Sequence, residues 1–436
     1  MGKFIIKKGV LIEFESQWMH MNIPFDDKEK LEKFRKQFGL EDETRIIIPD
    51  NVTTIGKKAI SFNKYIKEVV IPPSVKIIEE EAFCNCSSLE KVVFSEGLEK
   101  IGYYAFSMCP ALTSLDLPDS LKNLESIGTH IDSTVIIPKD AQFAGCDHFG
   151  WRNYRNAVID NDSPYYYYYD GIVYEKGTDA IHFVPRDIEG KIDIKPGTGV
   201  IPDGAFNNCE NLREVVIPDS VTAIGDRAFA RSGISKITIP DSVKSIGEAA
   251  FSGCNNLKDI SFLPISITAL EKWIFRGTSI KKLIIPSNIH TIKSFAFSDC
   301  EVLEDAMIPD TVEEICNNAF ENCKSLRTIS ITGNIKAIPD RLCKDCKSLE
   351  RAIIGDGIKV INEGAFYGCK SLTKIVIPEG VTIISRNAFA KCLSLQEIVL
   401  PSSIGQIHKT AFNKCDKLPG NSIPKDLIVD KIAKII

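Results

Sequence analysis

The chain has 436 residues, of which 44% are hydrophobic and 25% are charged. This balance excludes a disordered chain, and no apolar run approaches the roughly 18 residues that a membrane-spanning helix needs. Lys and Arg total 53 against 58 for Asp and Glu, so the sequence shows no basic footprint for nucleic acid or anionic lipid and predicts no membrane insertion.

The first 45 residues are expected to form a cap. Two short apolar runs within Lys3–Phe14 flank a Lys-Lys-Gly sequence, which predicts a β-hairpin with Gly9 at its turn. Asp26 is suited to N-cap a helix in which Glu29 closes a capping box and which ends at Gly39. We therefore expect a hairpin and a solvated, charged helix that cover the edge of the repeats that follow.

The N-terminus also bears on localisation. Lys7 and Lys8 interrupt the apolar run Phe4–Ile6 before it reaches the length of a signal peptide. We expect a cytoplasmic protein from the chain as written, and a surface or secreted protein if an export signal has been trimmed.

From about Ile46 to about Gly420 the chain repeats one unit, IxIPxxVxxIxxxAFxxCxxLxx, which Val215–Lys236 shows clearly. Neighbouring units are 22 to 24 residues apart, usually 23. A fixed period of this length is typical of a solenoid, in which each unit contacts only its neighbours and one core runs through the array. The Phe of the Ala-Phe pair recurs at Phe83, Phe106, Phe206, Phe229, Phe251, Phe297, Phe320, Phe366, Phe389 and Phe412, with Ile60, Phe275 and Cys343 in the same column.

The repeat breaks after Val135. The segment keeps the Ile-Ile-Pro opening but loses the Ala-Phe pair, and it ends in the sequence GWRNY at 150–154. An array needs an atypical terminal unit to close its apolar end, so we expect a first array over residues 46–158.

Residues 159–191 are expected to form a tyrosine-rich β-meander, with turns at Asp170-Gly171 and Gly177-Thr178. Strand alternation places Tyr165, Tyr167 and Tyr169 on one face and Tyr166 and Tyr168 on the other. Two interpretations stay open. The aromatic rings cover the apolar end of the second array, or they form an exposed platform for a glycan or a peptide.

The second array is expected over residues 192–420, and residues 421–436 are expected to cap it. Ile428, Ile432, Ile435 and Ile436 recur at helical spacing in this tail, which indicates a helix.

Ten of the 14 cysteines follow the Phe column by three residues, and their spacing is therefore that of the repeat. Small inward side chains in such a column suit packing better than pairing, and reduced thiols favour a reducing compartment. The CxxC sequence Cys343–Cys346 has one Cys in each column, so the repeat accounts for it without a redox or zinc site. The ten cysteines are Cys86, Cys109, Cys209, Cys254, Cys300, Cys323, Cys346, Cys369, Cys392 and Cys415.

Motifs of catalysis do not occur in the sequence. The six His residues form no HExxH or HxH pattern, and neither a GxSxG nor a phosphate-binding GxxxxGK[ST] sequence occurs. We expect no catalytic residue, no metal ligand and no cofactor.

The pattern IPxxVxxIxxxAFxxCxxLxxI resembles the BspA-like, or treponemal-type, leucine-rich repeats, over roughly 85% of the chain. The GWRNY segment is similar to the terminating motif of such proteins, and the Tyr/Asp-Gly segment to the hairpin that restarts them. The resemblance implies an α/β solenoid, a right-handed superhelix of about 14–15 repeats of about 23 residues. Parallel strands would line its concave face, and mostly irregular or 3-10 turns its convex side. Members of the family are surface antigens and adhesins that bind host proteins or other cells.

The expected concave face offers the candidate binding surface. In each LxxIxI stretch the Leu and the flanking aliphatics point inward, which leaves the residue between the aliphatics outside. Nine of these 14 outward positions are apolar, which indicates an interaction surface, although β-branched residues are also favoured in any strand. The outward positions are Ile47, Val70, Val93, Asp116, Asp193, Val216, Thr238, Ser261, Ile284, Met307, Ser330, Ile353, Val376 and Val399.

The candidate partner-binding residues are Val216, Ile284, Met307, Ile353, Val376 and Val399, with Arg351 and Lys374 beside them. The charged row next to the apolar one mixes both signs, which favours cross-strand charge pairing over a steering field. We expect a non-enzymatic protein that binds a protein partner with this face, and a host or other cell-surface protein is one candidate partner. Glycan binding through Tyr165, Tyr167 and Tyr169, or a purely structural spacer role, are the alternatives.

Overall fold

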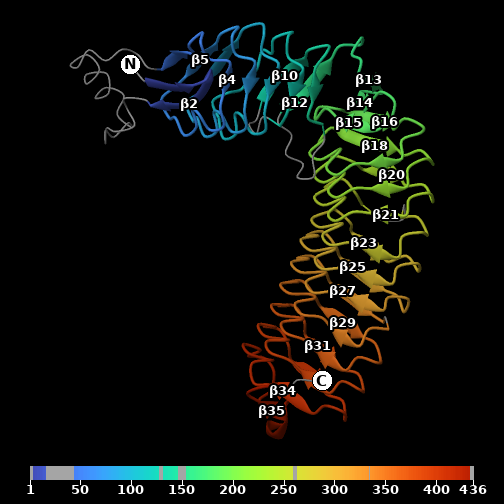
Figure 1. Cartoon of the computed structure of the whole chain (residues 1–436). Helices are drawn as coiled ribbons and strands as arrows, with labels where there is room; N and C mark the ends of the chain where they lie inside the picture. The colour runs from blue at the N-terminus through green and yellow to red at the C-terminus, as the bar shows by residue number, and fades with distance from the viewer. Residues whose placement is uncertain are drawn as a thin grey trace. The chain divides into compact units, whose positions relative to one another are not determined.

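The computed structural model describes residues 3–15, 44–126, 131–145, 154–258, 263–332 and 334–432. The chain forms two compact units (Figure 1). Unit 1 comprises Met1–Asp147 and Trp151–Pro185, and unit 2 comprises His148–Gly150 and Arg186–Ile436. The predicted helix at 26–39 and most of the GWRNY segment lie outside the described residues.

The coils of unit 1 form two parallel ladders, a main sheet and a second ladder. The main sheet contains β3 (Arg45–Ile47), β5 (Glu68–Ile71) and β7 (Lys91–Phe94). The second ladder contains β4 (Thr54–Ile55), β6 (Ile77–Ile78), β8 (Lys100–Ile101), β9 (Asn123–Leu124) and β11 (Gln142–Phe143). A further parallel pair, β10 (Ile131–Ile137) and β12 (Tyr154–Ile159), follows the third main strand in the chain.

The predicted N-terminal hairpin is confirmed. β1 (Lys3–Lys7) and β2 (Val10–Glu15) pair antiparallel around Lys8 and Gly9, both of which have positive φ angles, as a tight two-residue turn requires. β2 also pairs in parallel with β4, where Leu11 lies opposite Ile55. The hairpin therefore closes the first edge of the second ladder.

The meander consists of β13 (Tyr166–Tyr169), β14 (Ile172–Glu175) and β15 (Ile181–Phe183) in an antiparallel sheet. Tyr166, Val173 and Phe183 are buried in one hydrophobic core with the side chains of the first array. The prediction that the meander covers the second array is therefore corrected, because it packs on the first and belongs to unit 1.

Unit 2 repeats the same two ladders over more coils (Figure 1). Its main strands are β16 (Gly190–Asp193), β18 (Leu212–Val216), β20 (Lys236–Thr238), β23 (Lys282–Ile284), β25 (Asp305–Ile308), β27 (Thr328–Ile331), β29 (Arg351–Ile354), β31 (Lys374–Val376) and β33 (Glu397–Val399). Its second-ladder strands are β17 (Val200–Ile201), β19 (Ala223–Ile224), β21 (Ser245–Ile246), β22 (Ala269–Leu270), β24 (Thr291–Ile292), β26 (Glu314–Ile315), β28 (Ala337–Ile338), β30 (Val360–Ile361), β32 (Ile383–Ile384), β34 (Gln406–His408) and β35 (Ile428–Val429).

Two expectations about helical content need correction. Outside the main sheet, the coils contribute strands of two or three residues to the second ladder, and turns and irregular structure make up the rest. No α-helix occurs among the described residues, and the 3-10 helix found there is η2 (Lys425–Leu427), so the protein is a β-solenoid and not an α/β one. The tail is not helical at Ile428, which pairs as β35 with Ile407 of β34. Pairing with the open edge of β34 satisfies backbone groups that an isolated short helix would leave to water.

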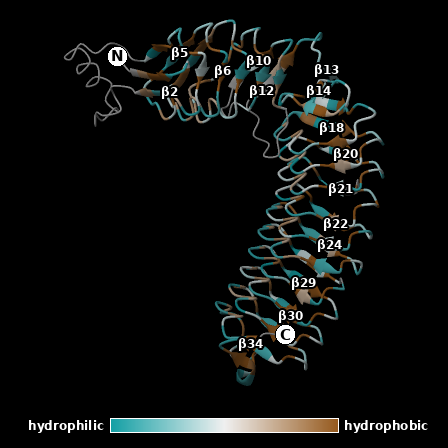
Figure 2. Cartoon of the chain, viewed as in Figure 1, coloured by the Kyte–Doolittle hydropathy of each residue, from teal (hydrophilic) through white to brown (hydrophobic). Residues whose placement is uncertain are grey.

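The core consists of columns of similar side chains. Figure 2 shows hydrophobic segments, in brown, recurring along the coils. The Phe rings of successive coils stack nearly parallel, with centroids 5.0 Å apart for Phe206 and Phe229 and 5.3 Å apart for Phe297 and Phe320. These separations follow the rise from one coil to the next, which is about 4.8 Å in a parallel ladder. The predicted inward Phe column is confirmed.

The cysteine column makes hydrogen bonds as well as filling space. Cys109 Sγ donates to Phe83 O and Cys323 Sγ to Phe297 O, each over 3.2 Å and each to the preceding coil. Burial raises the pKa of Cys300 to about 11, so this thiol keeps its proton at neutral pH. Where the column holds Thr278 instead, the hydroxyl donates to Phe275 O over 2.9 Å. We infer that the column selects a small side chain with a hydrogen-bond donor.

This inference is tested by replacing Cys323 with threonine and, separately, with valine. The two side chains are similar in size, but only threonine supplies a donor, as Thr278 does in its own coil. We expect Cys323→Thr to be more stable than Cys323→Val by roughly 0.5–1.5 kcal/mol. Urea unfolding followed by circular dichroism measures the difference. A more stable valine variant, the usual order in a core without an acceptor, contradicts the hydrogen-bond role.

A second prediction concerns the oxidation state of the column. None of the 13 cysteines among the described residues forms a disulfide, and Cys84 and Cys316 are the two that are not buried. Protein denatured in guanidinium without reductant is expected to release close to 14 thiols to Ellman's reagent, since the chain has 14 Cys. Native protein is expected to release far fewer. A denatured count well below 14 would reveal disulfides.

Candidate functional site

The outward row of the main sheet lies where the sequence predicts it. Ile284 is 72% exposed and Met307 62% exposed, while their strand neighbours Leu283 and Ala306 are buried. Val376, Val399 and Ile353 are also exposed, at 50%, 42% and 36%. Strand alternation therefore leaves apolar side chains on the outer surface of unit 2.

The structure brings five of the six apolar candidates into one stretch of the surface, which we call the apolar row. Ile284, Met307, Ser330 and Ile353 are in register across β23, β25, β27 and β29. The row continues on β31 and β33, where Val376 lies opposite Val399. The sixth candidate, Val216, lies apart on β18, between Asp193 and Thr238.

The apolar row crosses an interruption of the main sheet between β29 and β31. On one side of it, the backbone N–H groups of Glu350 and Arg351 donate to Arg327 O at 2.9 and 3.0 Å. On the other side, Gln396 and Glu397 donate in the same way to Thr373 O at 2.9 and 3.2 Å.

By the same pattern, the N–H groups of Thr373 and Lys374 would donate to Glu350 O, but these bonds are absent among the described residues. The facing edges of β29 and β31 therefore carry free backbone groups. The second ladder continues through the same coils, because β28, β30 and β32 are paired. At this point the coils are thus hydrogen-bonded through the second ladder but not through the main strands.

The interruption contains a groove of about 550 Å³. Ile353, Val376 and Ala352 all line it, and Ala352 is half-buried although its position is buried in most coils. A groove of this volume is within the range of ligand-binding clefts. It is lined by Glu350, Arg351, Ala352, Ile353, Ile354, Thr373, Lys374, Val376 and Pro378.

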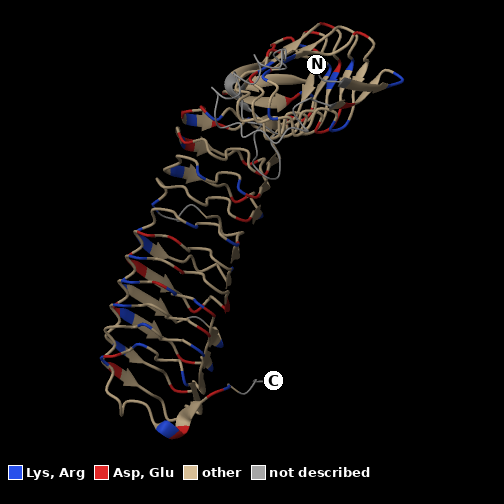
Figure 3. Ribbon diagram, turned by 90° about the vertical axis from the view of Figure 1, so that its left-hand side faces the viewer, with Lys and Arg blue, Asp and Glu red and all other residues tan. Residues whose placement is uncertain are grey.

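The two charged candidates lie on the groove and differ in their partners. Lys374 pairs with Glu397 on the adjacent strand, with Nζ 2.7 Å from Oε1. Arg351 makes no ion pair with any described residue. Lys236 pairs with Glu214 in the same cross-strand manner at 3.2 Å, which confirms charge pairing along this row. Figure 3 shows both signs interspersed along the coils of unit 2.

The three aromatic candidates differ in their surroundings. Tyr167 donates its hydroxyl to the Asp179 carboxylate and stacks on the buried Tyr174, with ring centroids 5.8 Å apart. Tyr165 and Tyr169 are partly exposed, but so is Tyr168, which points to the opposite face of β13. The exposed rings are therefore divided between both faces of the strand.

The meander is fastened to β11, the last strand of the second ladder in unit 1. Phe143 N–H donates to Tyr166 Oη at 3.3 Å, and Phe143 O faces His182 Nε2 at 2.8 Å. His182 Nδ1 lies 3.1 Å from Glu175 Oε1. Burial raises the pKa of the Tyr166 hydroxyl, which keeps it protonated.

Sequence reasoning missed a hollow of about 490 Å³ beside this contact. Among its lining residues are Tyr103, Asn123, Gln142 and Tyr165, which come from three coils and from the start of the meander. The repeat template gives no signal for it, because these positions are variable in every unit.

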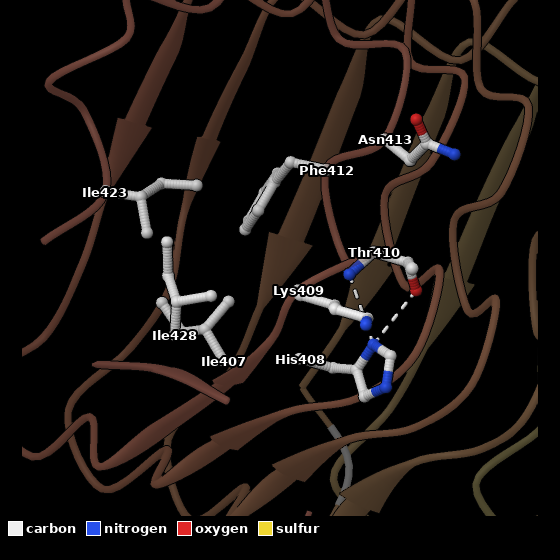
Figure 4. Close-up of a pocket in the computed structure, with 8 residues that line it drawn as sticks. All are labelled: Ile407, His408, Lys409, Thr410, Phe412, Asn413, Ile423 and Ile428. Atoms are coloured by element: carbon white, nitrogen blue, oxygen red, sulfur yellow. Dashed lines mark hydrogen bonds between the residues drawn. The ribbon is translucent and has the colours of Figure 1, made fainter. Parts of the chain in front are cut away.

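A third hollow, of about 340 Å³, lies at the last coil of unit 2 (Figure 4). Ile407 and Phe412 continue core columns, and Ile423 and Ile428 belong to the C-terminal cap. The imidazole of His408 is hydrogen-bonded within its own turn, where Nδ1 accepts from Thr410 N–H at 3.1 Å. The hollow is the loosely filled end of the core.

The described residues contain no group of three or more His, Cys, Asp or Glu side chains that could hold a metal ion. Nor does this part of the chain contain a helix with the length and hydropathy to cross a membrane.

Comparisons with known proteins agree with this architecture. A family model for the BspA type leucine-rich repeat region matches residues 35–147, 189–304 and 291–419, with 6 copies. No curated protein sequence matches the chain.

Among solved structures, a leucine-rich cell surface protein of Faecalibacterium prausnitzii is 27% identical over 87% of each chain, with a TM-score of 0.40. A leucine-rich repeat protein of Bacteroides ovatus is 23% identical over 96% of this chain and 91% of that chain, with a TM-score of 0.46. A leucine-rich repeat protein of Eubacterium ventriosum is 20% identical over 88% of each chain, with a TM-score of 0.50.

Because the residues matched by the family model make up more than half of the sequence, the chain belongs to the BspA-type leucine-rich-repeat family.

Proposed function

We propose that the protein is a non-enzymatic binding module that captures a protein partner on the main sheet of unit 2, centred on the groove between β29 and β31. Leucine-rich repeats of this kind serve in general as interaction or adhesion scaffolds. The observation that carries the proposal is the interruption of the main sheet, where exposed apolar side chains, free backbone groups and the unpaired Arg351 meet.

The chemistry of the groove specifies the kind of segment that binds. Ile353 and Val376 supply apolar walls for one or two aliphatic or aromatic side chains, which are the usual anchors of an interface. Arg351 is available to bind a carboxylate of the partner, because its guanidinium has no acidic partner among the described residues. The backbone N–H groups of Thr373 and Lys374 offer two further donors. The partner is therefore a protein segment with an apolar anchor next to Asp or Glu.

A passive spacer role is the competing interpretation. A spacer needs only the ladder bonds between coils, and it would gain nothing from a row of exposed Ile, Met and Val side chains. The glycan alternative through Tyr165, Tyr167 and Tyr169 as one platform loses support, because Tyr167 is bonded and stacked inside the meander.

The proposal predicts that Ile353→Asp, Val376→Asp and Val399→Asp together weaken partner binding by at least about 100-fold. The partner is first identified by photo-crosslinking from a residue placed at Val376, then purified, and its affinity is measured by biolayer interferometry. The three introduced aspartates would repel the acidic segment of the partner, and the apolar side chains that line the groove would be lost.

The matched control is the triple variant Ile47→Asp, Val70→Asp and Val93→Asp. These positions are also outward and in register on three successive strands of unit 1, so this variant carries the same cross-strand repulsion. It is expected to bind as tightly as the native protein, and both triple variants are expected to show a similar fall in melting temperature. If the groove variant and the control bind the partner equally well, the assignment of the binding site to the groove is wrong.

A further inference from the structure

The hollow of unit 1 contains a set of recognition groups that the protein itself does not use. Asn123 and Gln142 are in register on β9 and β11, which places their side-chain amides side by side at the spacing of parallel strands, about 4.8 Å. Neither side-chain amide makes a hydrogen bond with a described residue, although the backbone N–H groups of both are bonded. Two amide NH2 groups and two carbonyl oxygens are thus presented together at one wall of the hollow.

Two phenol rings border the same hollow. Tyr103 follows β8 and is 54% exposed, and Tyr165 precedes β13 and is 37% exposed. Neither hydroxyl has a hydrogen-bond partner in the described part of the chain. Half-exposed rings offer flat apolar faces together with a polar edge.

The hollow does not suit an added peptide strand. The edge of β11 would be the template, but its Phe143 N–H is bonded to Tyr166 Oη and its Phe143 O to His182 Nε2. Backbone pairing with a peptide is therefore blocked at this edge.

The charged side chains around the hollow already have partners within the protein. Glu125 pairs with Lys100 at 2.9 Å, and Glu175 faces His182 at 3.1 Å. Lys176 donates to the carbonyl of Ser163. The carboxylates of Glu125 and Glu175 would repel a strongly anionic ligand. A cationic ligand would have to compete with the partners that these carboxylates already have. The groups left for a ligand are neutral amides, hydroxyls and ring faces.

From this arrangement we propose that the hollow of unit 1 binds a neutral saccharide. Its hydroxyls exchange hydrogen bonds with the amides of Asn123 and Gln142, and the apolar face of a sugar ring packs on Tyr103 or Tyr165. The volume of about 490 Å³ admits a small saccharide or the end of a longer glycan. This site is independent of the groove in unit 2.

The proposal is tested with the full chain on an array of neutral and acidic glycans, followed by titration calorimetry with the neutral saccharides that give a signal. The native protein is expected to bind neutral saccharides. Tyr103→Ala and the double variant Asn123→Ala with Gln142→Ala are each expected to weaken binding by about tenfold or more.

Tyr104→Ala is the matched control. Tyr104 is also an exposed tyrosine, with its ring centroid 6.3 Å from that of Tyr103, but it does not line the hollow. Its variant is expected to keep saccharide affinity within about twofold of the native value. The triple Asp variant of the groove is also expected to keep it, which separates this site from the protein-binding surface. An array without neutral-glycan signal, or equal affinity of the pocket variants and the control, overturns the proposal.

Discussion

The structure depends on hydrogen bonds that join each coil to the next at the same position. In the turn that carries the Phe column, Phe83 N–H donates to Ala105 O at 2.8 Å and Phe366 N–H to Ala388 O at 2.7 Å. Because these bonds fix the register, each inward side chain meets the same column in the adjacent coil. A column must then hold side chains that stack on copies of themselves, which explains parallel Phe rings and thiols bonded to the preceding coil.

The same register explains how much of the fold could be predicted from the sequence. A side chain's orientation repeats with the period, so the inward Phe and Cys columns and the outward Ile284 and Met307 follow from spacing alone. The second ladder does not follow, because two residues per coil are too few to show alternation. The isoleucines of the tail have helical spacing, yet Ile428 lies in a strand, and spacing alone gives no sign of this. The free edge of β34 decides between a helix and a strand, and it is visible only in three dimensions.

The candidate site could be predicted only in part for a related reason. Spacing identifies Ile353 and Val376 as outward, but it cannot show that the bonds between their strands are missing. The unit 1 hollow is still less visible, since Tyr103 and Tyr165 are 62 positions apart in the printed numbering and meet only because the meander is fastened to Phe143. The meander follows one array and precedes the other. Only the contacts of Tyr166 and His182 show that it packs on the first.

Both proposed sites lie where the repetition fails. Within a regular stretch, every coil presents nearly the same surface and its backbone groups are consumed by the ladders, so a partner has little to distinguish one coil from another. Between β29 and β31 the main sheet is interrupted while the second ladder remains paired, which adds a groove and free backbone groups at that point. At β11 the second ladder ends, and the meander closes its edge with Tyr166 and His182 side chains. In a solenoid, specificity therefore arises where the coil-to-coil bonds are interrupted or end, because only there does one coil differ from its neighbours.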